Sequence, residues 1–257
     1  MRKLGQHFLK NKSVLRLISE SLDLAPENTV IEIGPGHGEL TEFLAATRAA
    51  KIIAIEKDEN LYNSLVKKFQ GDARITITLG DALTMLPTIT HDQKFAQNYK
   101  VVGNIPYYIT GHLFRVLSEL DHKPERCSFT IQKEVAERIC SLPPRMNRLA
   151  ASVQFWASAK IIKILPSSDF SPPPKVSSAI IVLETSKPSA LTAERYYSAV
   201  RSLFAQPRKT LVNNIAKAAV LTGALVAEKL SAIGITPNDR PQNLNIKDVV
   251  AIAKTFF

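Results

Sequence analysis

Residues 29–41 read TVIEIGPGHGELT, an apolar β-branched run that leads into three closely spaced glycines and then into a helical pattern. Glycine lets the backbone come close to a ligand without a Cβ in the way, and the first turn of a helix presents unpaired N–H groups. Ligands of open α/β sheets bind at the carboxyl ends of the strands. The stretch therefore predicts a ligand-binding turn after the first strand of an α/β domain.

The alternation of strand and helix patterns continues along the chain to about residue 135. Further strands are expected at residues 51–56, 74–79, 100–103, 126–132, 160–165 and 177–183. Strands that alternate with helices indicate βαβ units and a parallel sheet. The last two strands indicate a hairpin that closes the sheet, so we expect a Rossmann-like α/β fold.

Beyond residue 186 the pattern is helical only, which predicts a second, smaller, all-helical domain. Helices are expected there at residues 196–204, 208–221, 226–233 and 246–256. We therefore place a cofactor-binding domain over residues 1–186 and a helical domain over residues 187–257. The helical domain holds ten Lys or Arg against four Asp or Glu, so it is the more basic part of the chain.

The chain as a whole is basic. Its 257 residues carry a formal net charge of +10, with a sequence pI near 9.6. Such a surface attracts polyanions, so nucleic acid is the first expected partner and an anionic membrane the second. No run approaches the roughly 20 apolar residues that span a bilayer. Residues 1–12 lack an apolar signal core, so we expect a cytoplasmic protein that does not use a membrane.

Residues that commonly bind metals are too scattered to predict a metal site. Cys127 and Cys140 form no CxxC pair, and the five histidines show no ligand spacing. We therefore expect no metal, and we expect both cysteines to be free thiols.

An acidic residue at the end of the second strand limits which class of ligand the glycine turn is expected to bind. Glu56 lies 22 residues after Gly34, where a carboxylate accepts the hydroxyls of an adenosine ribose. The dinucleotide fingerprint GxGxxG would need glycine at Glu39, and a negative side chain there would repel a pyrophosphate. Asp81, after the third strand, is placed to accept the amino group of adenine. Together with Gly36, these residues predict a cofactor with adenosine but no phosphate, such as S-adenosylmethionine.

The fourth strand ends in Asn104-Ile105-Pro106-Tyr107, which suits chemistry on the amino group of an adenine. That nitrogen is a poor nucleophile because its lone pair is delocalised into the ring, so a methylase must offer acceptors to its two hydrogens. The side-chain oxygen of Asn104 and the carbonyl of Pro106 are expected to be these acceptors. Tyr107 is expected to stack on the purine, which must be flipped out of a duplex or already unpaired.

These motifs resemble those of the ribosomal RNA adenine N6-dimethyltransferase family over nearly the whole chain. The resemblance is carried by GQHFL (5–9), IEIGPGHGELT (31–41), IEKD (55–58), GDAL (80–83), VGNIPYYIT (102–110), QKEVAERI (132–139) and DFSPPPKVSSAIIVL (169–183). It implies a class I S-adenosylmethionine-dependent methyltransferase fold, with donor contacts at His7, Leu9 and Asn104 besides the residues named above. It also implies that Phe170 faces the target base opposite Tyr107, with core packing as the alternative role of Phe170.

The basic tail is similar to that of the family's small-subunit branch. This likeness rests on FAQPRKTLVNNI (204–215) and GITPNDRPQNLNIKDV (234–249). It implies dimethylation of two adjacent adenosines in the 3′-terminal hairpin of 16S rRNA, within an immature 30S subunit. The sequence does not indicate an oligomeric state, so a monomer is the default expectation. Arg208 and Lys209 are the expected RNA contacts, and a salt-bridged helix start is their alternative role.

Three other functions remain open from the sequence. A small-subunit assembly factor that acts mainly by binding would keep the fold without needing the methyl donor. A 23S rRNA adenine N6-methyltransferase would share the catalytic core. A DNA adenine methyltransferase would carry a related tetrapeptide beside a different recognition domain.

Overall fold

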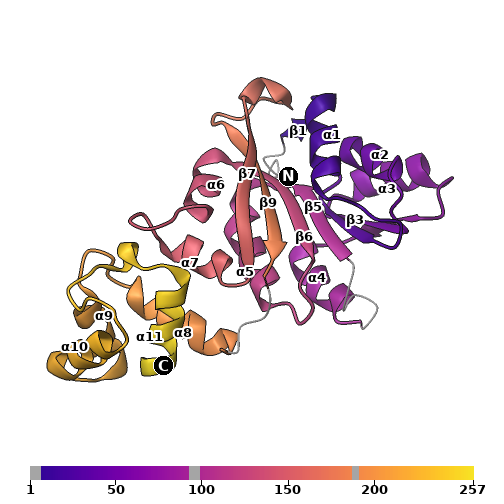
Figure 1. Cartoon of the computed structure of the whole chain (residues 1–257). Coiled ribbons are helices and arrows are strands. Elements are labelled where there is room, and N and C mark those ends of the chain that lie inside the picture. Colours follow the sequence, from indigo (N-terminus) through magenta and orange to yellow (C-terminus); the bar gives the residue numbers. More distant parts are fainter. Residues whose placement is uncertain (1–6, 93–98, 187–190) are drawn as a thin grey trace. The chain divides into compact units, whose positions relative to one another are not determined.

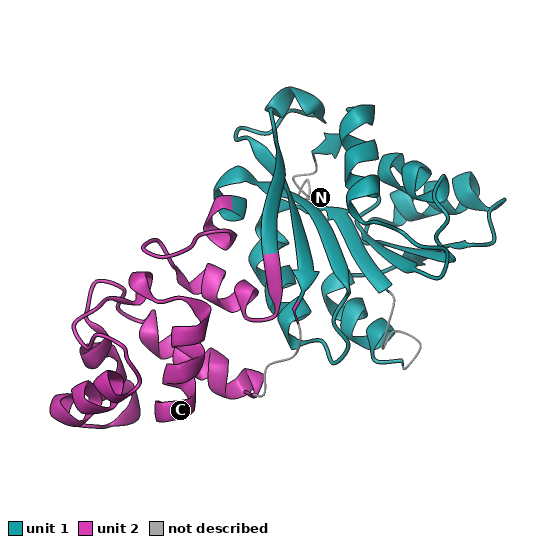
Figure 2. Cartoon of the chain, in the orientation of Figure 1, with its two compact units in different colours: residues 1–136, 159–185 teal, residues 137–158, 186–257 magenta. Residues whose placement is uncertain are grey.

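The computed structural model describes residues 7–92, 99–186 and 191–257. The chain forms two compact units, drawn in different colours in Figure 2. Unit 1 comprises residues 1–136 and 159–185, and unit 2 comprises residues 137–158 and 186–257. Each unit encloses a hydrophobic core of its own.

Unit 1 is built on a seven-stranded sheet in the order β4-β3-β2-β5-β6-β9-β7 (Figure 1). The strands are β2 (Thr29–Ile33), β3 (Lys51–Glu56), β4 (Ile75–Leu79), β5 (Tyr99–Asn104), β6 (Arg126–Gln132), β7 (Ala157–Leu165) and β9 (Ser178–Thr185). Strands β2 to β6 are parallel, and β9 runs antiparallel to β6. The predicted α/β fold is confirmed, and the two late strands lie side by side at one end of the sheet.

The helices of unit 1 follow the strands. They are α1 (Lys12–Ser21), α2 (Glu39–Ala45), α3 (Glu59–Phe69), α4 (Ala82–Thr90), α5 (Thr110–Glu119) and α6 (Lys133–Ile139). Asn11, Asp58 and Asp81 each accept backbone N–H groups at the start of α1, α3 and α4. Such a cap stabilises a helix by about 1 kcal/mol. These caps fix where the helices begin, next to the carboxyl ends of the strands.

The strand order reverses between β2 and β5. From β2 the chain moves outward through β3 to β4 and then returns to β5 on the other side of β2. A crevice forms where helices diverge to opposite faces at such a reversal, and ligands bind there. A two-stranded sheet closes over this region, because β1 (Phe8–Leu9) pairs antiparallel with β8 (Phe170–Ser171).

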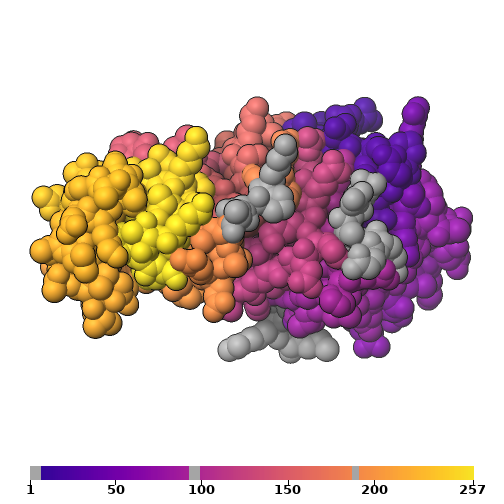
Figure 3. Space-filling model, turned by 60° about the horizontal axis from the view of Figure 1, so that its bottom comes forward, coloured from indigo at the N-terminus to yellow at the C-terminus, as the bar shows by residue number. Residues whose placement is uncertain are grey.

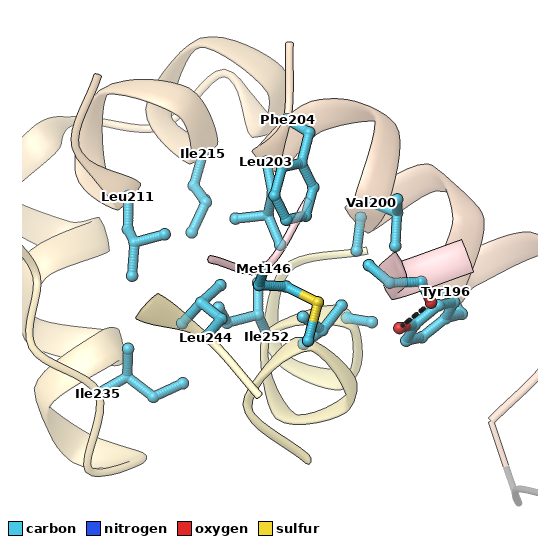
Figure 4. Packing of buried hydrophobic residues seen from close by; sticks show 14 of the residues in the cluster. Met146, Tyr196, Val200, Leu203, Phe204, Leu211, Ile215, Ile235, Leu244 and Ile252 are labelled. Atoms are coloured by element: carbon cyan, nitrogen blue, oxygen red, sulfur yellow. Dashed lines mark hydrogen bonds between the residues drawn. The ribbon is translucent and has the colours of Figure 1, made fainter. Parts of the chain in front are cut away.

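Unit 2 is a helical bundle around a single apolar cluster. Its helices are α7 (Arg148–Gln154), α8 (Ala193–Leu203), α9 (Leu211–Ala219), α10 (Gly223–Ala232) and α11 (Ile246–Phe256). Figure 4 shows Met146, Leu203, Leu244 and Ile252 pointing into this cluster. In Figure 3 the C-terminal helix α11 (yellow) lies at the surface beside α8 (orange), against which it packs.

The second unit is larger than the sequence predicts. The expected boundary at residue 186 assigns residues 137–158 to the first domain, whereas the structure places them in unit 2. The Tyr196 hydroxyl donates to the Ala151 carbonyl at 2.9 Å, and the Phe155 ring stacks on the Tyr196 ring at 3.8 Å between centroids. These contacts join segments that are 45 positions apart in the chain, so no local pattern indicates them.

Within the described residues, no single helix is long and apolar enough to cross a membrane. Helices α9 and α10 reach the required length only as a pair, and that pair is bent by 115°.

The expected helix over residues 208–221 is shorter than predicted, since α9 begins at Leu211. Arg208 and Lys209 therefore lie in the turn before it.

Candidate active site

An open pocket lies at the carboxyl ends of β2, β3 and β5 in unit 1. Of the residues predicted from the sequence, it is lined by His7, Gly34, Gly36, Glu56, Asp81, Asn104, Pro106, Tyr107 and Phe170. Leu9 is buried at 3% exposure and faces a smaller neighbouring cavity instead. Gly5 and Gln6 of the first motif lie outside the described residues. The topology thus brings together residues that are up to 163 positions apart in the sequence.

The glycine turn has a backbone that other residues would strain. Gly34 and Gly36 have φ angles of +65° and +63°. A Cβ on Gly36 would lie 2.9 Å from two ring carbons of Phe8, closer than real side chains approach. A side chain at Gly36 would therefore meet the Phe8 ring, which lines the same pocket, whereas at Gly34 only the backbone angle restricts the residue type.

Glu56 is held by backbone donors on three sides. Its Oε2 accepts from the N–H of Gly36 at 3.1 Å, and its Oε1 accepts from the N–H groups of Lys57 and Asp58 at 2.9 Å each. An ionised carboxylate offers about four acceptor positions. Roughly one is therefore left for a ligand hydroxyl, and a ligand that uses two must displace a backbone donor.

The Asp81 carboxylate also accepts hydrogen bonds within the protein, and one donor is Lys57, a residue that the sequence did not single out. Asp81 Oδ1 accepts from the Leu83 N–H at 2.9 Å, and its Oδ2 accepts from Lys57 Nζ at 2.8 Å. The hydrogen bond from Lys57 holds the pKa of the Asp81 carboxyl below its usual value, against an opposing effect of burial. Lys57 lines the pocket as well. Its position directly after the strand that ends in Glu56 is the one sequence signal that could have found it.

The Asn104 side chain has a defined orientation. Its Nδ2 donates to the backbone carbonyl of His7 at 2.7 Å. Only the nitrogen end of the amide can make this bond, because a carbonyl oxygen accepts and does not donate. The Oδ1 atom is therefore the end that remains to accept a hydrogen bond from a ligand in the pocket.

The two residues that follow are placed by the turn after β5. The Pro106 carbonyl accepts from the Ile109 N–H at 3.1 Å and lies 3.5 Å from the Thr110 hydroxyl. The Tyr107 hydroxyl shares a 2.8 Å hydrogen bond with the Ser178 hydroxyl. Burial raises the pKa of Tyr107, so its phenol stays protonated at neutral pH. Tyr107 therefore presents a neutral, half-buried ring to the pocket.

Phe170 both lines the pocket, where the target base is expected, and packs in the core. Its ring lines the pocket, yet only 1% of the residue is exposed, and it belongs to the same core cluster as Leu9. A base that stacks on this ring must first displace neighbouring groups.

Arg208 and Lys209 lie in unit 2, in the turn before α9. Both are exposed, and within the described ranges neither makes an ion pair with an acidic side chain. The salt-bridged helix start is therefore not seen, and both cations are open to solvent.

Glu32 is a buried acid that the sequence analysis missed. It is 1% exposed in β2, and its Oε2 accepts from the Thr41 hydroxyl at 2.7 Å. Burial raises its pKa to about 8, an effect that the bond from Thr41 partly offsets. Glu32 is visible in the stretch TVIEI, but a single acid within an apolar strand does not by itself indicate that its side chain is buried.

No group of three or more His, Cys, Asp or Glu side chains that could hold a metal ion occurs in the part of the chain that the structure describes. Cys127 is a buried free thiol, and burial raises its pKa.

The sequence family described as ribosomal RNA adenine dimethylase matches residues 1–256. The chain belongs to this family. A ribosomal RNA small subunit methyltransferase A from Dehalococcoides mccartyi is 35% identical over 250 residues, which cover 95% of this chain and 84% of the relative. A protein of the same name from Prochlorococcus marinus is 36% identical over 264 residues, which cover 98% of this chain and 92% of the relative.

Solved structures agree with this dimethylase fold. A dimethyladenosine transferase from Plasmodium falciparum matches with a TM-score of 0.82 at 24% identity, over 98% of this chain and all of that one (100%). The 23S rRNA methyltransferase ErmE matches with a TM-score of 0.76 at 25% identity, over 97% of this chain and 99% of that one. The class I methyltransferase fold predicted from the sequence is thereby confirmed.

Membership makes the chain an rRNA adenine dimethyltransferase that takes its methyl groups from S-adenosylmethionine, as predicted. The residues present fit that donor. Gly36 lines the pocket without a side chain, and Glu56 presents a buried carboxylate at the strand end. Asp81 lies beside Glu56 along the same pocket wall.

Proposed function

We propose that this dimethylase modifies N6 of two adjacent adenosines in the 3′-terminal hairpin of 16S rRNA, within an immature 30S subunit. Two relatives that carry a small-subunit name match 95% and 98% of the chain, the basic tail included. The proposed substrate also implies action in the cytoplasm, and we propose that the enzyme works as a monomer.

The observation that carries the proposed mechanism is the fixed orientation of Asn104. Because Nδ2 is bound to the His7 carbonyl, Oδ1 is available to accept a hydrogen from the target N6. An acceptor there favours the tetrahedral nitrogen of the transition state over the planar nitrogen of free adenine. The acceptor is in place before the base arrives, so no reorganisation of Asn104 is needed during the reaction.

The second proposed acceptor for N6, the Pro106 carbonyl, already accepts a hydrogen bond within the turn after β5. This carbonyl accepts from the Ile109 N–H and lies 3.5 Å from the Thr110 hydroxyl, so it serves the base only if the Thr110 hydroxyl turns away. The carbonyl of Ile105 is the alternative in the same turn. Tyr107 supplies one face of the base site, and Phe170 supplies the other once its ring is uncovered.

The donor contacts are proposed along the rest of the pocket. Glu56 accepts a ribose hydroxyl, Asp81 accepts the adenine amino group, and the turn at Gly34 and Gly36 receives the donor's methionyl part. His7 completes the site from the N-terminal segment, and the predicted contact of Leu9 would have to come from the smaller cavity beside it. S-adenosylmethionine would supply a methyl group on a positively charged sulfur: a C–N bond to N6 replaces the C–S bond, the sulfur departs as a neutral thioether, and N6 loses a proton to solvent. The protein's task is therefore mainly to position N6 in line with that methyl group.

Unit 2 is proposed to bind rRNA through its exposed cations, Arg208 and Lys209 among them. Contacts to phosphates give affinity without reading sequence. The choice of adenosine then rests on the pocket, which must receive a base that is unpaired or flipped out.

Mass spectrometry of digested RNA tests the substrate assignment. The enzyme and S-adenosylmethionine are incubated with 30S subunits that lack the modification, with naked 16S RNA or with naked 23S RNA. We expect N6,N6-dimethyladenosine at adjacent 16S positions, formed best in the subunits. Methylation of 23S RNA alone would contradict the assignment. Binding to subunits without methyl incorporation would instead support an assembly factor.

A further inference from the structure

We propose that Asp169 is a positioning residue for methyl transfer, which acts on Asn104 through the N-terminal strap, residues 7–11. The inference rests on the proposed role of Asn104 as the acceptor for N6. Asp169 does not line the donor pocket, and although it opens the motif DFSPPPKVSSAIIVL (169–183), neither the sequence nor the resemblance gives it a role.

Asp169 anchors one end of the strap with two hydrogen bonds. Its Oδ1 accepts from Asn11 Nδ2 at 2.7 Å, and its backbone carbonyl accepts from the Lys10 N–H at 3.0 Å. The side-chain bond is partly buried and involves an ionised acceptor, which makes it stronger than a bond between neutral groups. The strap is thus tied to a segment 158 positions away in the chain.

The middle of the strap is held by strand pairing. Phe8 pairs with Ser171 and Leu9 with Phe170. His7 Nδ1 donates to the Pro172 carbonyl at 2.7 Å. From its anchor to its first described residue, the strap therefore follows the segment that carries the proposed base-stacking ring.

The other end of the strap meets the catalytic amide. The His7 carbonyl accepts from Asn104 Nδ2, and this bond gives Asn104 its orientation. Any shift of the strap moves the His7 carbonyl and frees the amide to rotate, which would turn Nδ2 towards the base in place of Oδ1. Asp169 controls the position of the strap and so the orientation of the acceptor.

The chemistry of Asn11 separates anchoring from helix capping. Its Oδ1 caps α1 by accepting from the N–H groups of Ser13 at 3.1 Å and Val14 at 3.4 Å. Asp caps helices about as well as Asn. Asn differs from Asp in having an Nδ2 group, and the Nδ2 group of Asn11 donates its hydrogen bond to Asp169. Asn11→Asp therefore keeps the cap, removes the anchor and places two carboxylates side by side.

The test exchanges the donor and the acceptor of the hydrogen bond between Asn11 and Asp169. We compare Asn11→Asp, Asp169→Ala and the double variant Asn11→Asp/Asp169→Asn, in which the new amide can donate back to the new carboxylate. The turnover number on 30S subunits is measured at saturating donor, and the melting temperature is measured in parallel. Both single variants should lose about tenfold in turnover, and the double variant should regain most of it.

Asn147→Asp is the matched control. Asn147 caps α7 through Oδ1, and its Nδ2 donates to the Arg138 carbonyl at 2.9 Å, in unit 2. This control should lose stability without losing turnover, whereas the strap variants should lose turnover at temperatures where they remain folded.

Unchanged turnover in Asn11→Asp and Asp169→Ala would overturn the inference, and so would a double variant no better than Asn11→Asp. Asn104→Ala is measured alongside, because it tests the acceptor role itself. If Asn104→Ala is inactive while the strap variants are normal, the proposal for Asp169 fails and the proposed function stands.

Discussion

Asn104, Glu56 and Asp81 already use part of their hydrogen-bonding capacity within the protein. The Nδ2 group of Asn104 already donates a hydrogen bond within the protein, and its Oδ1 atom remains available to a ligand. The Glu56 and Asp81 carboxylates each have only some of their acceptor positions available. The residue types and their order along the strands could be predicted from the sequence. Their partners could not, because each partner depends on how separate loops meet at the strand ends.

Lys57→Met is expected to tighten donor binding severalfold. The ammonium group of Lys57 occupies Asp81 Oδ2, the atom proposed to receive the adenine amino group, and adds a positive charge near a cationic donor. The pKa of Asp81 should rise towards its usual value in this variant, because the bond that lowers it is gone. Calorimetric titration with S-adenosylmethionine measures the effect.

Lys67→Met, on the exposed face of α3, is the control and should leave donor affinity unchanged. Weaker donor binding by Lys57→Met would show that Lys57 supports the donor and does not compete with it.

Glu32→Gln is expected to change how stability depends on pH. The folded state raises the pKa of Glu32 from 4.5 to about 8, so the folded state binds a proton that the unfolded state has lost between these values. Stability therefore falls as pH rises from about 4.5 to about 8, by an upper bound of about 5 kcal/mol for this group. Glutamine keeps an acceptor for Thr41 and carries no charge.

Thermal unfolding from pH 5 to pH 8.5 should show a steeper decline for the natural protein than for Glu32→Gln. Parallel curves for the two proteins would contradict the raised pKa.

At the scale of elements, the glycine turn and the helix caps could be predicted because local sequence determines them. A β-branched run, a turn that needs positive φ and a helical period are visible within residues 29–41. The pairing of β1 with β8 could not be predicted in the same way. Each strand has only two residues, and their register is set by contacts with the rest of unit 1.

Gly36→Ala is expected to weaken donor binding at least tenfold and to cost about 1 to 2 kcal/mol of stability. A Cβ strains a backbone with φ of +63° and would meet the Phe8 ring at 2.9 Å. Equilibrium unfolding and donor titration measure the two effects.

Gly111→Ala is the matched control, since Gly111 lies in α5 and a Cβ there would have nothing within 4 Å. This control should be neutral or slightly stabilising, because alanine favours helices. Gly36→Ala with normal donor affinity would show that the turn does not face the donor.

At the scale of the whole molecule, the helical pattern beyond residue 186 predicted a helical second part, and residues 186–257 lie in unit 2. The pattern did not predict that residues 137–158 join that part. Met146 and Tyr196 come from different stretches of the chain and share one core, as Figure 4 shows. Long-range packing of this kind leaves no periodic signal in either stretch.

Arg208→Ala/Lys209→Ala is expected to weaken rRNA binding and leave turnover at saturating RNA nearly unchanged. Each lost phosphate contact should reduce the salt dependence of binding, by about 0.7 to 0.9 in the slope of log K against log salt. Filter binding at several salt concentrations measures this slope.

Lys51→Ala/Lys67→Ala removes the same charge from exposed positions of unit 1 and serves as the control. Equal losses in both double variants would show that net charge alone, and not the turn before α9, governs RNA binding.

The central claim is that Asn104 presents its oxygen to an adenine N6 on the small subunit. The most direct measurement is mass spectrometry of adenosine from 30S subunits lacking the modification, after incubation with S-adenosylmethionine and either the natural protein or Asn104→Ala. We predict N6,N6-dimethyladenosine at adjacent positions with the natural protein and none with the variant, although the variant still binds subunits. Equal methylation by both proteins would contradict the account.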